Sequence, residues 1–443
     1  MEGPEERPSR VPEEASPEGE VRGRWAWTEP AVWTERMLTA LEAGVRGGRW
    51  FSLIDKVYGE ANLAAAYEAV RRNKGAAGAD NQTIEMFGHD LGTNLRNLSD
   101  ELRAGRYRPS VVRRVWIDKP GSREKRPLGI PTVRDRVVQG ALRSVLEPIF
   151  ERDFADNSYG FRPGRGCKEA LRRVDHLLKA GATWVVDADL RSYFDTIPHE
   201  KLLARVKEKV TDRRVLGLIE AYLGADVMDG LGRWTPERGS PQGAVISPLL
   251  SNIYLDPLDH LMAGNGNEMV RYADDSVILC RTQAEAEEAL SVMRRWVEEA
   301  GLSLHPDKTR IVDATAPGGF DFLGYHFEQG RRTPRGKSMR KLKDAIRAKT
   351  RRTHGTSLKT IISEVNLTLT GWFGYFKHSH RYTFEPIDAW VRMRLRSILR
   401  QRMGLRGRGR GADHQRWPNV YFKAHGLVSL VERHAWERQS LTR

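Results

Sequence analysis

The stretch from Glu268 to Cys280 constrains the fold of this chain more than any other segment. Apolar residues lead into and out of Ala273-Asp274-Asp275, a pattern typical of a β-hairpin with a tight turn. Two adjacent carboxylates between apolar strands form dense negative charge that a cation stabilises, so the pattern indicates a magnesium site. The alternative is an ordinary solvated turn, because Asp is a preferred turn residue.

A second stretch, Thr183 to Asp195, predicts another apolar strand, which ends at Asp189. Three carboxylates from two strands suit the two divalent ions that hold the attacking and leaving oxygens of a phosphoryl transfer. We therefore expect Asp189 to lie beside Asp274 and Asp275. Strand alternation puts Asp187 on the same face as Asp189, which makes Asp187 the chief rival ligand.

Seven sequence blocks accompany the hairpin in order. With Tyr272-Ala-Asp-Asp275 they resemble the group II intron-encoded branch of the reverse transcriptases, the maturase-reverse transcriptases, over roughly Trp50 to the C-terminus. Helices interleaved with a few mostly antiparallel strands indicate an α+β palm. The resemblance implies a right-hand polymerase, with fingers and palm followed by a mostly helical thumb or maturase domain. The blocks are Arg126-Pro-Leu-Gly-Ile-Pro131, Ser158-Tyr-Gly-Phe-Arg-Pro163, Asp189-Leu-Arg-Ser-Tyr-Phe-Asp195, Gly239-Ser-Pro-Gln-Gly243, Ser247-Pro-Leu-Leu250, Pro306-Asp-Lys-Thr309 and Phe322-Leu-Gly-Tyr325.

Composition, periodicity and the resemblance together divide the chain into five parts. Within them we expect a basic hairpin at residues 111–130 and C-terminal helices at 356–376 and 384–402, while the strand pattern fades past Gly330. The parts are a disordered acidic tail (1–24), a helical N-terminal extension (25–108), fingers and palm (109–330), a thumb or maturase domain (331–403) and a short basic DNA-binding segment (404–443).

The charge of the chain predicts a polyanionic partner, because the net charge is +15 and the pI is about 9.8. Positive charge is concentrated between Arg331 and Lys359, where 12 Lys and Arg accompany one acidic residue, and again between Val391 and Arg416. The nucleic-acid footprint is therefore expected in the C-terminal quarter of the chain, whereas the basic hairpin at 111–130 could also be a solvated face. The predicted RNA contacts are Arg331, Arg332, Arg335, Lys337, Arg340, Lys341, Lys343, Arg347, Lys349, Arg351 and Arg352.

The resemblance also implies roles for residues around the nucleotide. Lys119 and Arg126 would contact the triphosphate, and the Phe194 ring would lie beneath the sugar and exclude a 2′-hydroxyl. Core packing is as good an account of the neighbouring Tyr193. The remaining assignments are the Leu190 carbonyl as a metal ligand, Gln242 as a nucleotide contact, Gly243 as the site of close backbone approach, and Lys308 either as the proton donor to pyrophosphate or as a surface lysine.

As a function we predict an RNA-directed DNA polymerase that uses two Mg²⁺ ions. By the resemblance it binds a group II intron RNA, assists its splicing and copies it during retrohoming. Its partners would be an RNA template with a DNA or RNA primer, deoxynucleoside triphosphates and target DNA, and it would act as a monomer or dimer on RNA.

Further sequence features limit the sites, the location and the additional activities that we expect. Cys167 and Cys280 have no metal-ligand or disulfide spacing, no long apolar run predicts a membrane span, and a cytoplasmic protein that joins the nucleoid on DNA is expected. The spacing of an HNH nuclease is absent, so the primer would come from another source. Two alternatives are a domesticated reverse transcriptase in antiviral defence and a non-catalytic RNA-binding splicing chaperone.

Overall fold

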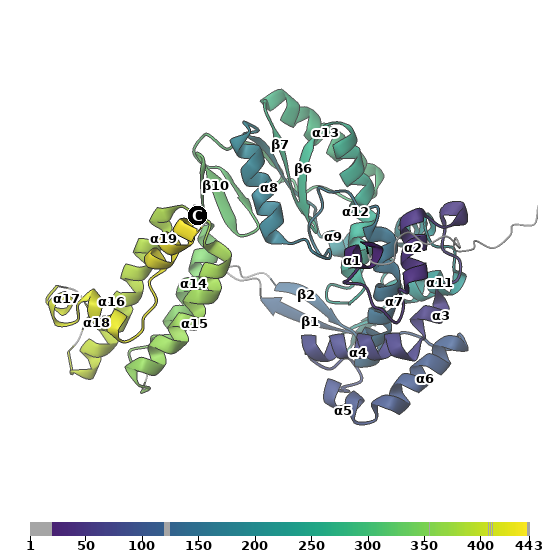
Figure 1. The fold of residues 1–443 in the computed structure, drawn as a ribbon, viewed down its shortest axis with the longest axis horizontal. Helices are drawn as coiled ribbons and strands as arrows, with labels where there is room; N and C mark the ends of the chain where they lie inside the picture. The colour runs from purple at the N-terminus through teal and green to yellow at the C-terminus, as the bar shows by residue number, and fades with distance from the viewer. Residues whose placement is uncertain are drawn as a thin grey trace, which may run out of the picture. The chain divides into compact units, whose positions relative to one another are not determined.

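Figure 1 shows the computed structural model of the chain, which describes residues 20–118, 125–353, 355–405, 407, 409 and 411–440. The acidic tail to residue 19, Lys119 and the arginines 406, 408 and 410 of the basic C-terminal run lie outside these ranges. The fold is α+β, as predicted, and it separates into two compact units, one ending at Ile311 and the other beginning at Val312. No helix in the described ranges has the length and apolar character needed to cross a bilayer.

The first unit begins with helices that bury one apolar face each. Trp33 is fully buried, and its indole nitrogen donates to the Ser144 carbonyl at 2.9 Å. The helical extension predicted for this region is present, and Leu38 and Leu63 on its apolar faces are inaccessible to solvent. The elements are α1 (Glu20–Arg24), α2 (Glu35–Ala43), η1 (Arg46–Gly48), α3 (Ile54–Val57), α4 (Glu60–Asn73), α5 (Ile84–His89) and α6 (Leu91–Arg103).

A four-stranded sheet of order β2-β1-β4-β5 follows. The predicted basic hairpin is present as β1 (Val112–Asp118) paired antiparallel with β2 (Lys125–Ile130). Sequence analysis missed the short hairpin of β4 (Val227–Asp229) and β5 (Gly232–Trp234), because three-residue strands carry too little alternation to register as a pattern.

A second four-stranded sheet, of order β6-β7-β3-β8, carries the acidic residues. β3 (Trp184–Asp189) pairs antiparallel with β7 (Asp275–Cys280), which pairs antiparallel with β6 (Glu268–Tyr272). β8 (Arg310–Asp313) closes the edge. The remaining helices of the unit are α7 (Val133–Glu151), α8 (Cys167–Lys179), α9 (Tyr193–Thr196), α10 (His199–Lys207), α11 (Arg213–Leu223), α12 (Ser247–Gly264) and α13 (Gln283–Glu299).

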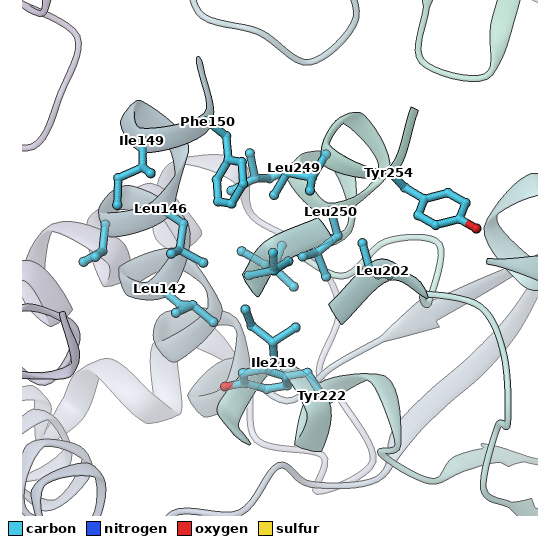
Figure 2. Close-up of a cluster of buried hydrophobic side chains, with 14 of the residues drawn as sticks. Leu142, Leu146, Ile149, Phe150, Leu202, Ile219, Tyr222, Leu249, Leu250 and Tyr254 are labelled. Carbon is cyan, nitrogen blue, oxygen red and sulfur yellow. The ribbon is translucent and has the colours of Figure 1, made fainter. Parts of the chain in front are cut away.

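The core of the first unit is a continuous apolar cluster that anchors this sheet to the helices. In Figure 2, Leu142 and Leu146 of α7 face Leu250 of α12, with Ile219 of α11 below them. Val186 of β3 belongs to the same cluster and is fully buried. Burial of each such side chain contributes about 1.5–3 kcal/mol, so packing against this cluster stabilises the strands that carry the acidic residues.

The second unit joins a three-stranded sheet, order β11-β10-β9, to a helical bundle with its own apolar cluster. Two elements differ from expectation, since β11 (Arg331–Pro334) and α14 (Gly336–Lys349) form where no strand or helix was predicted. The other elements are β9 (Phe320–Phe322), β10 (Tyr325–Glu328), α15 (Leu358–Phe376), η2 (Arg381–Thr383), α16 (Phe384–Arg402), α17 (Asp413–Arg416), α18 (Asn419–Ala424) and α19 (Leu430–Ser440).

Candidate active site

Strand register brings the predicted carboxylates together. Asp189, the last residue of β3, lies directly opposite Asp275 on β7, and Tyr272 of β6 pairs with the same Asp275. Ala273 and Asp274 alone make the turn, so Asp275 is the first residue of β7 rather than part of the turn as expected. Directly opposed residues of an antiparallel pair point to the same face, so the Asp189 and Asp275 side chains share one face of the sheet.

Asp187, the rival ligand, lies on that same face but farther from the turn. It pairs with Val277, two positions along β7 from Asp275. Its Oδ2 lies 3.4 Å from the Nε of Arg310 on the neighbouring strand β8. Asp187 is therefore engaged by a cation of the protein at a position one pleat removed from the hairpin tip.

The electrostatic environment of the tip is strongly acidic. Burial raises the pKa of Asp274, and the nearby Asp189 carboxylate raises it further, while the backbone, Arg271 and Lys308 act in the opposite direction. The ammonium of Lys308 lies 2.9 Å from Oδ2 of Asp189. Lys308 is exposed, as a surface lysine would be, yet it contacts the predicted site directly.

The oxygen donors at the tip suit a hard cation, although they do not form a closed cage. In the described ranges, no three His, Cys, Asp or Glu side chains lie close enough together to hold a metal ion by themselves. Mg²⁺ typically takes one or two carboxylates and completes its shell with waters and substrate phosphates. Asp189 and Asp274, with the exposed Asp275 beside them, fit that kind of open site.

A buried polar network supports the tip, and sequence analysis did not find it. Arg271 of β6 is 2% exposed and pairs with Asp259 of α12, which is fully buried. The same guanidinium donates to the Ala273 carbonyl at 2.9 Å and to the Ser158 hydroxyl at 2.8 Å. The only signal in the sequence was an arginine inside an apolar strand, where a charge needs a partner.

The Ser158 to Pro163 block docks against the hairpin. Arg271 exchanges backbone hydrogen bonds with this segment, since its amide donates to Asn157 and its carbonyl accepts from Tyr159. A Cβ on Gly160 would lie 2.3 Å from the amide nitrogen of Ala273, so only glycine permits this approach. The block thus packs against the turn that carries Asp274.

Part of the predicted nucleotide site lines a groove of about 600 Å³ in the first unit. Phe194 and Gln242 line it, together with Arg114 and Trp116 of β1 and Trp234 of β5. Tyr193 points elsewhere, because its ring is in the core and its hydroxyl donates to the Ser251 carbonyl at 2.9 Å.

Backbone contacts fix the wall of this groove. The amide of Gly129 in β2 donates to the Gln242 carbonyl at 2.7 Å. Gly243 has φ +108°, and a Cβ there would lie 2.7 Å from the Gly129 carbonyl oxygen. Close backbone approach at Gly243 therefore occurs against β2, the strand that also carries the exposed Arg126, which does not line the groove itself. Leu190 is buried beside the site, in a bridge with Leu304.

The predicted RNA-binding residues of the second unit fall into two groups. Some already have partners in the protein: Lys349 donates to the Glu364 carbonyl at 3.0 Å, Arg332 donates to the His378 carbonyl at 2.6 Å, and Arg347 forms an exposed pair with Asp344 at 2.6 Å. Arg335 and Lys343 are half-buried. The exposed members, with no ion pair seen among the described residues, are Arg331, Lys337, Arg340, Lys341, Arg351 and Arg352.

Comparison with known proteins finds two family matches, one mostly in the first unit and one in the second. Residues 117–327 match the family described as reverse transcriptase (RNA-dependent DNA polymerase), and residues 339–417 match the group II intron maturase-specific domain. Protein YkfC of Escherichia coli (strain K12) is 35% identical over 343 residues, which cover 68% of this chain and 85% of YkfC.

Two intron-encoded proteins are also similar. The group II intron-encoded protein LtrA of Lactococcus lactis subsp. cremoris is 38% identical over 196 residues, which cover 44% of this chain and 32% of LtrA. An uncharacterized 91 kDa protein in the cob intron of Schizosaccharomyces pombe is 38% identical over 199 residues, covering 44% of this chain and 24% of that protein. The chain thus spans less than two thirds of these two relatives.

These matches do not favour the antiviral-defence or the non-catalytic alternative. Reverse transcriptase domains generally use divalent metal ions, and a maturase domain beside one implies nucleic-acid binding. The chain belongs to the group II intron-encoded reverse transcriptases/maturases, and its enzymatic activity is that of an RNA-directed DNA polymerase.

Proposed function

We propose that this protein copies a group II intron RNA into DNA at a centre formed by Asp189, Asp274 and Asp275. The observation that carries the proposal is the register that sets Asp189 opposite Asp275, next to the turn that bears Asp274. Two Mg²⁺ ions, when bound there, supply activation of the primer 3′-hydroxyl and neutralisation of the pyrophosphate. The Leu190 carbonyl, which follows Asp189 directly, is a further ligand in this proposal.

The chain's own residues would bind and orient the nucleotide. Phe194 and Gln242 line one groove, which supports their assignment to the sugar and the nucleotide. Arg126 with Lys119, which lies outside the described residues, would hold the triphosphate from the β1–β2 hairpin. Lys308, already 2.9 Å from Asp189, is placed to act on the leaving pyrophosphate, either as proton donor or as a fixed positive charge.

The second unit would hold the intron RNA and assist its splicing. The exposed basic residues of α14, including Lys337, Arg340 and Lys341, support this role, because free ammonium and guanidinium groups bind phosphate. Residues 404–443 would contact target DNA during retrohoming, with a primer strand supplied from outside the protein. The protein would act in the cytoplasm and on the nucleoid, as a monomer or dimer on the RNA.

Substitution of the turn aspartate tests the catalytic assignment. Asp274→Asn should reduce extension of a DNA primer on an RNA template with Mg²⁺ by roughly 10³-fold or more, the scale of losing a catalytic group. RNA binding should be unchanged, because the proposed RNA surface lies in the other unit. Asp153→Asn, a surface change in the same unit, is the control and should extend primers like the parent.

Asp187→Asn separates the two possible ligand sets. It should keep most of the activity, since Asp187 lies one pleat from the tip. Equal extension by Asp274→Asn and the parent would refute the assignment, and loss in Asp187→Asn alone would transfer it to Asp187. Sequencing of RNA that copurifies with the protein would identify the intron, and recovery of unrelated RNA alone would contradict the intron partnership.

A further inference from the structure

Arg271 uses every hydrogen of its guanidinium inside the protein. Its Nε donates to Oδ1 of Asp259 at 2.7 Å, and one terminal nitrogen donates to Oδ2 of Asp259 and to the Ser158 hydroxyl. The other terminal nitrogen donates to the Asn252 side chain at 3.1 Å and to the Ala273 carbonyl at 2.9 Å. A guanidinium has five N–H donors, so none is left for solvent or for substrate.

The group that this fork holds is the peptide bond before Asp274. Ala273 has φ +59°, a left-handed conformation that costs a non-glycine residue about 1–3 kcal/mol and persists only where the surroundings enforce it. The Ala273 carbonyl accepts a hydrogen bond from Arg271. The Ala273 amide nitrogen packs so closely against Gly160 that a Cβ at position 160 would lie 2.3 Å from it. Asn252 links these two supports, because it donates to the Gly160 carbonyl at 2.8 Å while it accepts from Arg271.

The charge of Arg271 has its counterpart on a different element. Asp259 belongs to α12, the helix that packs in the centre of the apolar cluster in Figure 2, and it is fully buried. The turn is therefore tied to a helix of the apolar core as well as to the segment around Ser158. The adjacent carboxylates of Asp274 and Asp275 repel each other, and a buried cation tied to the core opposes that repulsion.

We propose that Arg271, held by Asp259, is a positioning residue that fixes the Ala273–Asp274 peptide and so aims the Asp274 carboxylate. The proposal rests on the catalytic role proposed for Asp274. This role needs the branched shape of the guanidinium. A lysine at the same place keeps the charge, but it cannot form a bidentate pair with Asp259 and reach the Ala273 carbonyl at the same time. Arg271 touches no substrate in this assignment.

Two variants separate positioning from stability. Arg271→Lys keeps the charge and removes the fork. The double variant Arg271→Met/Asp259→Leu removes the pair without leaving a lone buried charge, a replacement that is often neutral for stability. The control is Arg143→Met/Glu147→Leu, which removes a partly buried ion pair on α7, outside the supports of the turn.

Each variant is measured by urea unfolding, by amide hydrogen exchange of the segment 268–280, and by primer extension. We expect both Arg271 variants to fold cooperatively, to exchange the turn amides at least ~10-fold faster, and to lose roughly 10–100-fold in kcat, with KM for the nucleotide little changed, since losing a group that orients a ligand has effects of this size. The control should change none of these.

Exchange needs no activity, so it distinguishes a failure of this inference from a failure of the proposed function. If the parent protein does not extend primers but the Arg271 variants still exchange the turn amides faster, the catalytic assignment fails and the positioning role of Arg271 stands. Unchanged kcat and turn exchange in either folded variant would overturn the proposal. So would faster exchange spread evenly over the whole unit, because that result describes a stabilising pair only.

Discussion

The two units use positive charge in opposite ways. In the first unit, Arg271 and Arg162 are each 2% exposed at the side chain, and they pair with the fully buried Asp259 and with Glu151, whose side chain is 12% exposed. In the second unit, Arg340 and Lys341 of α14 are exposed to solvent. A buried charge needs every partner in place, so it fixes geometry, whereas an exposed charge is available to a phosphate. The proposed polymerase centre thus depends on the fold, and the proposed RNA surface on exposed charge.

The contrast is not complete, because the second unit also contains structural arginines. Arg396 is 2% exposed and donates to the Trp417 carbonyl at 2.9 Å and to Asn419 at 2.8 Å. These contacts tie α16 to the segment around α17 and α18. Net charge alone therefore overstates the RNA-binding surface, and burial decides which basic residues can contribute to it.

The largest expected effect breaks a buried pair in the first unit. Glu151 binds Arg162 through three hydrogen bonds of 2.9 to 3.0 Å, and Glu151→Ala leaves a charge that is 2% exposed without its counter-ion. We expect the free energy of unfolding to fall by about 3–5 kcal/mol, measured by urea titration. Arg162 also holds the Ala155 and Ser158 carbonyls, so the backing of the turn should loosen.

A matched exposed pair is the control for this loss. Glu169→Ala breaks the pair of Arg172 and Glu169, whose side chains are 68% and 41% exposed. Exposed pairs contribute about 0–1 kcal/mol, so this variant should unfold close to the parent. Equal losses in the two variants would contradict the distinction between buried and exposed charge.

A smaller effect is expected at the nucleotide groove. If Phe194 excludes the 2′-hydroxyl, Phe194→Ala should lower the preference for deoxynucleotides over ribonucleotides by about 10–100-fold, the range that one pocket contact supplies. The ratio of the two kcat/KM values measures it. Tyr193→Phe is the control, because the Tyr193 hydroxyl bonds to the Ser251 carbonyl in the core. Unchanged selectivity in a folded Phe194→Ala would remove the residue from this role.

Sequence predicted the parts of the fold that have a strong local pattern. The hairpin around Asp274, the strand ending at Asp189 and the helix at 384–402 are present nearly as expected. β4, β5, β11 and α14 were not predicted, because three- and four-residue strands are short and α14 has few apolar residues, with only Leu342 and Ile346 buried. Their formation depends on pairing and packing partners far away in the sequence.

The three carboxylates of the acidic centre, Asp189, Asp274 and Asp275, could also be predicted, because the strand patterns and their spacing place them together. Its support could not, because Ser158, Asn252 and Asp259 lie 12 to 113 residues from Arg271 and meet only in the folded chain. The resemblance placed Lys308 near the pyrophosphate, but its ion pair with Asp189, 119 residues away, appears only in the folded chain. Contacts that depend on tertiary structure are therefore where sequence reasoning stopped.

The RNA surface should respond through salt dependence rather than stability. Arg340→Gln/Lys341→Gln removes two exposed charges, and each lost phosphate contact should reduce the slope of log K against log salt by about 0.7–0.9. Binding of the copurified RNA, measured over a range of salt concentrations, gives the slope. Arg294→Gln/Arg295→Gln, two exposed arginines of α13, is the control. An equal change in both variants would indicate a general charge effect instead of a defined surface.

The smallest effect tests Asp256, a partly buried carboxylate that lies 3.5 Å from His260. Burial raises the pKa of Asp256, although the Ala155 amide and His260 oppose the shift. A carboxyl whose pKa is raised by folding stabilises the protein below its ordinary pKa and loses that contribution as pH rises through the folded value. Asp256→Asn keeps an acceptor for Ala155 and avoids this loss, so it should be slightly more stable than the parent near pH 7. Thermal unfolding at several pH values should show the variant's advantage in stability shrinking in acid, whereas an advantage that grows in acid would contradict a raised pKa for Asp256.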